Sequence, residues 1–166
     1  MPPRDSIVEG RRSGRKALVK RAYHHGNLRQ AIIDAALHLV AERGARGFAL
    51  SEAAKLAGVS VAAPYRHFTD REALLATIAE EGFSHLLSRL EDAASRGRDG
   101  FERLMEMGVA YVLFAIAKPA HFAVMFDADI QKQKFPGLVE RACATSTLFA
   151  GAVHQCAETA HRQGGG

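Results

Sequence analysis

The sequence has no tryptophan and, among its 166 residues, only two cysteines and five prolines. It contains no run of 18 apolar residues, which a membrane-spanning helix would need, and no apolar N-terminal segment resembling a secretion signal. With 48% apolar residues the chain can still bury one good core or two small ones. These features predict a soluble cytoplasmic protein with no membrane partner.

The two cysteines do not suggest a disulfide. Cys143 and Cys156 are 13 positions apart (156 − 143) on a predicted helix, and at about 100° per residue they point to different faces. We expect two buried free thiols in a reducing compartment.

Features of several enzyme and metal-protein classes are also missing. The chain has no Gly-rich phosphate loop, no His and Cys set at metal-ligand spacing and no paired carboxylates in an apolar context. His24 and His25 have no carboxylate or thiol cluster beside them, and His38 is expected at the surface near Glu42. The sequence therefore indicates no enzyme, no metal site and no cofactor.

Basic charge is concentrated at the N-terminus. Residues 1–30 hold eight Lys and Arg against two acidic residues, a net charge of +6, so the remaining 136 residues carry 14 − 16 = −2. Residues 1–22 lack apolar periodicity, which predicts a disordered basic arm. The arm could follow DNA phosphates or enter a minor groove; a solvated tail without a specific role is the other interpretation.

The segment 50–68, LSEAAKLAGVSVAAPYRHF, predicts two short helices, over 50–57 and 61–67, separated by a break at 58–60. Gly58 permits the positive φ of a sharp turn, and Ser60 suits the N-cap of the second helix. Ala54 and Val59 are expected where the two helices cross. This pattern is typical of a helix-turn-helix, whose second helix lies in the major groove of DNA.

The string A-G-V-S, followed by Y-R-H-F and D-R-E-A-L-L, resembles the DNA-binding domain of TetR/AcrR-type transcriptional regulators, from about residue 23 to 75 without a gap. The resemblance implies an all-α fold, with a helix-turn-helix domain over 23–72, an effector and dimerisation domain over 73–163 and a tail over 164–166. It also implies a repressor that binds a palindromic operator in double-stranded DNA as a homodimer and is released by a small hydrophobic effector.

Residues of the second short helix are the expected DNA contacts. Arg66 alone can bond guanine in a bidentate manner, whereas Tyr65, His67 and Arg71 suit phosphate oxygens. Pro64 is expected to stiffen the helix entry, and Phe68 to turn into the core. The full predicted set is Ser51, Ser60, Val61, Ala62, Ala63, Tyr65, Arg66, His67 and Arg71.

Two further observations concern the supporting helices. Asn27 and Gln30 form a capping-box-like pair before a helix that Gly44 ends. Ala49 stands where related sequences usually have Thr or Ser as a helix cap, a loss of about 1 kcal/mol that Glu52 and Ser51 offset only in part.

The second half of the chain predicts four more helices. A long helix covers about 71–94, one begins after the cap Asp99, a short one covers 119–126, and the last runs over 136–163 after a charged loop. The helix after Asp99 carries an apolar stripe of Phe101, Leu104, Met105, Gly108, Val112 and Ala115. The stripe of the last helix consists of Leu138, Ala142, Thr145, Phe149, Ala152, Val153, Cys156 and Ala160.

The segment AYVLFAIAKPAHFAVMF resembles the effector domain of one branch of these regulators, in which P-x-x-F-x-x-M-F recurs. The expected ligand-binding residues are Tyr111, Phe114, His121, Phe122, Met125 and Phe126. They can line a mostly apolar pocket with two polar groups. The other interpretation is that these aromatic side chains are core.

In the family two final helices form a four-helix bundle with the second subunit, whereas this sequence ends after one of them. Either the chain is a shortened member, or a single helix from each subunit makes the dimer. With Ala49, this leaves a second functional hypothesis: a small helical ligand- or partner-binding protein with weakened, mainly non-specific DNA binding.

Overall fold

The computed structural model describes residues 28–127 and 129–163. Within these ranges the protein is all-α, as predicted, and has no strand. Its elements are α2 (Leu28–Arg43), α3 (Leu50–Leu56), the 3-10 helix η1 (Ala63–Arg66), α4 (Arg71–Arg96), α5 (Gly100–Ala117), α6 (Pro119–Asp127), the 3-10 helix η2 (Lys132–Lys134) and α7 (Pro136–Gln163). The basic arm, His24, His25 and the Asn27 cap lie outside the described residues.

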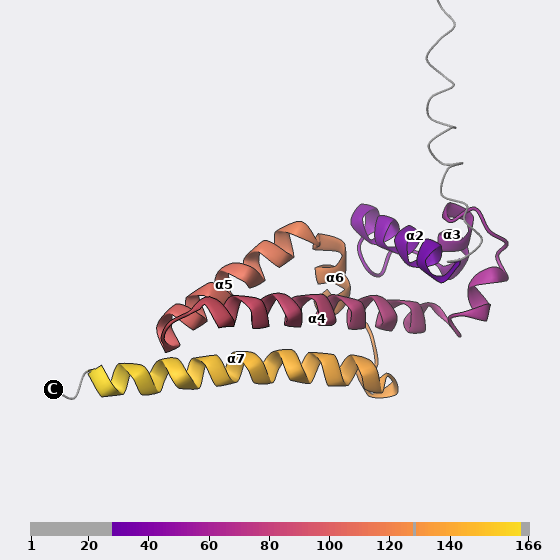
Figure 1. Cartoon of the computed structure of the whole chain (residues 1–166). Helices are drawn as coiled ribbons and strands as arrows, with labels where there is room; N and C mark the ends of the chain where they lie inside the picture. The colour runs from indigo at the N-terminus through magenta and orange to yellow at the C-terminus, as the bar shows by residue number, and fades with distance from the viewer. Residues whose placement is uncertain (1–27, 128, 164–166) are drawn as a thin grey trace, which may run out of the picture.

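The long helix α4 is the central element of the molecule (Figure 1). It begins at the predicted cap Asp70, whose carboxylate accepts a hydrogen bond from Ala73 N at 2.8 Å. α5 and α7 pack against α4 and also against each other, α6 packs on α4, and α2 and α3 lie near the N-terminal end of α4. Leu74, Ile78 and Leu86 on α4 are completely buried, so one helix contributes to the core along most of the molecule.

The helices α2 and α3 and the 3-10 helix η1 form the N-terminal head of the molecule, in which α2 is the longest element. Gly44 has φ +78° and its N–H bonds Val40 O at 2.8 Å, so it ends the helix as predicted. His38 is exposed and lies 3.3 Å from the Glu42 carboxylate, also as expected. Contacts between α2 and α6 join the head to the rest of the protein.

The predicted apolar stripe of α5 is wrong in part. Phe101 is 61% exposed, and the large apolar side chains exposed on this helix are Phe101, Met105, Val109, Val112, Leu113 and Ile116. The buried side chains are instead Met107 and Phe114. α5 is apolar on nearly all faces, so its periodicity does not select one. Its first residue helps to set its rotation: a Cβ on the buried Gly100 would lie 2.7 Å from Gln155 O of α7.

The last helix, α7, begins at Pro136 as predicted and buries Leu138, Thr145 and Ala152. Two members of its predicted stripe, Val153 and Ala160, are exposed instead. Both cysteines are free, as expected, but Cys143 is exposed and Cys156 half-buried, which corrects the prediction of buried thiols. A 28-residue helix has room for a second apolar face, and the sequence alone does not show which face packs against α4.

Among the described residues no single helix is long and apolar enough to cross a membrane. α5 and α6 reach the length and composition only together, and they are bent by 105° at the break between them.

Candidate nucleic-acid interface

The turn after α3 has the predicted geometry. Gly58 has φ +74°, its N–H bonds Lys55 O at 3.1 Å, and the next N–H, of Val59, bonds Ala54 O at 3.0 Å. These two bonds form a Schellman motif, which needs a left-handed residue where glycine is unstrained. Ala54 is completely buried at this crossing. The turn therefore fixes the direction in which the chain leaves α3.

The predicted second helix over 61–67 is shorter and tighter than expected. Residues 61 and 62 form a turn, and η1 is a 3-10 helix whose N-cap is Ala62, so Ser60 is not the cap. Ser60 instead contributes its carbonyl, which accepts from Ala63 N at 3.0 Å. Pro64 lacks an N–H and disfavours α geometry in the residue before it, which explains the 3-10 turn in place of an α-helix.

The side chains of residues 64–68 divide into a buried set and an exposed set. Pro64 and Phe68 are buried, as predicted for Phe68, whereas Tyr65 is 58% exposed and Arg66 and His67 are also exposed. Neither the Tyr65 nor the Arg66 side chain is hydrogen-bonded to any described residue. A phenol, a guanidinium and an imidazole thus face solvent over three consecutive positions.

The other predicted DNA-contact residues surround this triplet. Ser60, Val61 and Ala62 are exposed, while Ala63 and Ser51 are half-buried, Ser51 in the first turn of α3. The structure therefore brings every predicted residue of 60–67 to one short exposed segment beside α3.

Arg71 is placed differently from the prediction. Its guanidinium donates to Ala45 O and lies 4.9 Å from the centre of the Phe48 ring, and its Nε is buried without a partner. A cation over an aromatic face is stabilised without a carboxylate. Arg71 thus ties α4 to the loop after α2 rather than pointing outward to a phosphate. Phe48, an aromatic in a short loop, was the signal that sequence reasoning missed.

Ala49 is the N-cap of α3 without a side-chain cap bond. Alanine has no acceptor, so only the reciprocal half of a capping box exists: Ala49 N–H donates to Glu52 Oε2 at 2.8 Å. Arg43 bonds Glu52 Oε1 at 2.7 Å. The Ala49 amide first, and then Arg43, lower the pKa of Glu52. Glu52 therefore compensates in part, as expected.

Several cations of the head are engaged with carboxylates. Arg29 pairs with Glu81 at 3.2 Å and Arg46 with Asp129 at 3.0 Å. Among the described residues Lys55 on α3, which the sequence analysis did not single out, has no ion pair and is exposed. It adds a positive charge beside the exposed η1 triplet.

Three of the expected ligand-binding residues, Tyr111, Phe122 and Phe126, are joined by ring contacts. The ring centroids of Tyr111 and Phe122 are 5.6 Å apart, and those of Phe122 and Phe126 4.7 Å. Phe114 and Met125 are completely or almost completely buried. Burial therefore agrees with the core interpretation for Phe114 and Met125, whereas Phe126 is 49% exposed.

His121 lies on α6 and faces His85 of α4. Its ring centroid is 6.3 Å from that of His85, and the side chain is half-buried. Burial first, then the charges of Lys118 and His85, lower the pKa of His121. Its neutral form is therefore favoured in the fold.

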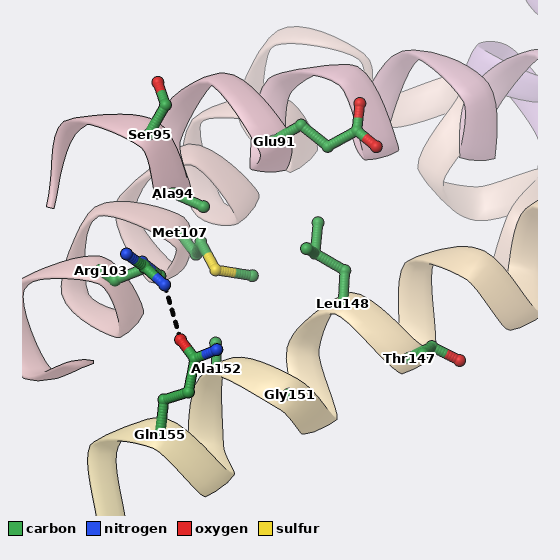
Figure 2. Close-up of a pocket in the computed structure, with 10 residues that line it drawn as sticks. All are labelled: Glu91, Ala94, Ser95, Arg103, Met107, Thr147, Leu148, Gly151, Ala152 and Gln155. Atoms are coloured by element: carbon green, nitrogen blue, oxygen red, sulfur yellow. Dashed lines mark hydrogen bonds between the residues drawn. The ribbon is translucent and has the colours of Figure 1, made fainter. Parts of the chain in front are cut away.

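A cleft of about 530 Å³ lies elsewhere, between α4, α5 and α7 (Figure 2). None of the six expected residues lines it. Its lining residues are Glu91, Ala94, Ser95, Arg103, Met107, Thr147, Leu148, Gly151, Ala152 and Gln155.

The described residues form an all-helical structure with an exposed helix-turn-helix at one end of a long helix, an arrangement that occurs in DNA-binding regulators. Residues 32–78 match the family model of the bacterial regulatory proteins of the tetR family. The chain belongs to this family and is a DNA-binding transcriptional regulator. No similar protein was found among curated sequences.

Solved structures share the fold. A protein with unknown function from Rhodococcus sp. RHA1 is 33% identical, with a TM-score of 0.68 over 84% of this chain and 73% of that one. A tetR family regulatory protein from Rhodococcus RHA1 is 23% identical, with a TM-score of 0.70 over 79% and 70%. The TetR family regulator PfmR from Thermus thermophilus is 20% identical, with a TM-score of 0.67 over 78% and 71%. The branch indicated by P-x-x-F-x-x-M-F stays a prediction.

Proposed function

We propose that the protein is a cytoplasmic repressor that binds a palindromic operator as a homodimer and is released by a small effector. The observation that carries the DNA-reading role is the η1 segment, where Tyr65, Arg66 and His67 are exposed while Pro64 and Phe68 anchor the backbone in the core. The proposed division is a reading head over 23–72 and an effector and dimerisation body over 73–163.

Within the head, each exposed side chain has a proposed role. Arg66 has the planar donor pair that matches the O6 and N7 acceptors of guanine. Tyr65 and His67 donate to phosphate oxygens and fix the position of the head without reading bases. Lys55 adds a phosphate charge. The short side chains of Val61, Ala62 and Ala63 let the backbone approach the groove and contact thymine methyls.

The proposed homodimer is supported by the outer face of α7. Exposed small or apolar side chains recur on it at alternating spacings of four and three residues: Val139, Cys143, Ser146, Ala150, Val153, Ala157 and Ala160. This is the spacing of a helix-helix seam, and small residues allow two backbones to approach closely. Two copies joined along α7 would present two reading heads.

Selection of bound fragments from random double-stranded DNA tests this function. We expect two inverted half-sites whose centres lie one helical turn apart, about 34–36 Å, or a multiple of it. A single site without symmetry would contradict the proposed dimer, and recovery of no sequence preference would contradict the repressor.

A second candidate is a partner-binding protein with mainly non-specific DNA binding. Six large apolar side chains exposed along α5 favour it, because contiguous exposed apolar surface usually marks an interaction site. Binding to unrelated sequences with equal affinity and a steep salt dependence would support this candidate over the repressor.

A further inference from the structure

The cleft between α4, α5 and α7 has a mainly apolar lining and a polar end (Figure 2). Met107, which is completely buried, and Leu148 point into the space between the helices. Ala94 and Ala152 also contribute to the apolar lining. At one end Arg103 Nη1 donates to Gln155 Oε1 at 2.6 Å, joining α5 to α7.

Arg103 lacks a counter-charge in the part of the chain that the structure describes. Its neighbours on α5 are paired elsewhere: Glu106 with Arg96 at 3.3 Å, and Glu102 with Arg98 Nε at 2.9 Å. Figure 2 shows the Glu91 carboxylate directed away from Arg103. The guanidinium is nevertheless half-buried, and its Nε is buried without a hydrogen-bond partner.

A half-buried cation without an anion costs free energy, since it has lost part of its hydration and gained only a neutral amide. An anion bound at this end of the cleft would compensate this cost, and a carboxylate matches the geometry of the guanidinium donors. The Gln155 amide nitrogen is a second donor for the same anion.

We propose that this cleft binds a small monocarboxylate with an apolar body, the carboxylate on Arg103 and Gln155 and the body over Met107 and Leu148. The volume of about 530 Å³ suits one small molecule. The role of this carboxylate as the releasing effector rests on the proposed repressor function. The binding site itself rests only on the geometry of the cleft.

Calorimetric titration of the full chain tests the site with two matched pairs: 4-phenylbutanoate against 4-phenylbutan-1-ol, and decanoate against 1-decanol. We expect each carboxylate to bind about tenfold or more tightly than its alcohol, because only the carboxylate makes charge-assisted bonds with Arg103. Equal affinity within both pairs, or no binding by either carboxylate, would overturn the proposal.

Three variants place the binding at this cleft. Arg103→Met should remove the preference for carboxylates. Gln155→Glu should place a carboxylate on Arg103, so that the melting temperature rises while carboxylate binding is lost. Gly151→Leu should fill the cleft, since a Cβ at Gly151 meets no atom within 4 Å. Gly108→Leu is the matched control, because a Cβ there also meets no atom within 4 Å and Gly108 does not line the cleft.

Carboxylate binding that persists in Gln155→Glu and Gly151→Leu would overturn the site even if Arg103→Met failed to fold. Operator release is measured separately. A carboxylate that binds through Arg103 without releasing a bound operator supports the site and contradicts effector-controlled repression. Operator binding without any carboxylate preference contradicts the site and leaves the DNA-reading role standing.

Discussion

Arg66 and Tyr65 are adjacent and both exposed, yet their side chains suit different parts of DNA. A guanidinium can discriminate guanine by about 1–3 kcal/mol, whereas a phenol on a phosphate carries no sequence information. We expect Arg66→Ala to relax specificity at one base pair and Tyr65→Phe to weaken binding to all sequences alike. Competition titrations against operators with single base changes measure both. A changed base preference with unchanged affinity in Tyr65→Phe would refute this division of roles.

The titration of His121 makes the stability of the folded protein depend on pH. Its pKa is lowered from 6.5, so between 6.5 and the folded value the unfolded chain binds the proton and the folded chain does not. Stability is therefore full above pH 6.5 and decreases as the pH falls through the folded pKa. Lys118 and His85 oppose protonation, while Glu81 and Asp34 favour it.

We expect His121→Gln to reduce the loss of stability below pH 6.5, because glutamine does not titrate. Urea denaturation at a series of pH values measures it, with His154→Gln as the control, since that histidine is exposed on α7. If the stability of His121→Gln depends on pH as much as that of the native protein, other groups determine the pH dependence.

The conformations of some single residues can be predicted from the sequence, and those of others cannot. The positive φ of Gly58 and the cap at Asp70 follow from local chemistry, so they were predictable. The inward turn of Arg71 and the exposure of Cys143 were not, because each depends on what the fold places beside the side chain. Phe48 is 23 residues before Arg71 in the chain (71 − 48), beyond the reach of a local pattern.

Among the elements, α3 offers a direct test of local stability. Its N-cap is alanine, and half of a capping box is formed by Glu52. We expect Ala49→Thr to supply the missing acceptor and stabilise the protein by about 1 kcal/mol. Chemical denaturation followed by circular dichroism measures the gain. Ala49→Val is the control, because valine has the shape of threonine without its hydroxyl acceptor; equal gains in both variants would argue against a capping effect.

The elements differ in how far periodicity predicts them. α2, α4 and α6 begin or end at caps, glycines and prolines that are legible in the sequence. η1 departs from the predicted α-helix because Pro64 acts within a segment of only a few residues. The buried face of α5 was missed because the helix is apolar on nearly all sides, so only its contacts with α4 and α7 select one.

At the scale of the whole molecule, the order of the helices and the all-α class were predictable, and the cleft was not. The cleft forms from residues 91–95, 103–107 and 147–155, which are distant in the chain, and its position depends on the rotation of α5. Three of the predicted ligand residues, Tyr111, Phe122 and Phe126, instead contact one another through their rings, since an aromatic-rich segment indicates a core as readily as a pocket.

The proposed dimer makes a prediction about two equally exposed side chains. Val153 on α7 and Leu113 on α5 are both 53% exposed. We expect Val153→Glu to place two like charges in the seam between the subunits and shift the protein to a monomer, while Leu113→Glu leaves the dimer intact. Light scattering after size exclusion gives the masses. Dissociation by Leu113→Glu alone would move the interface from α7 to α5.

In the proposed function, the exposed η1 triplet holds the protein on its operator. Fluorescence polarisation with a selected operator tests it by comparing the native chain with the variant in which Tyr65, Arg66 and His67 are all alanine. We predict that the variant keeps its helical content and its mass but loses specific binding, so that its affinity equals that for unrelated DNA. Undiminished affinity for the operator in the folded variant would contradict the account.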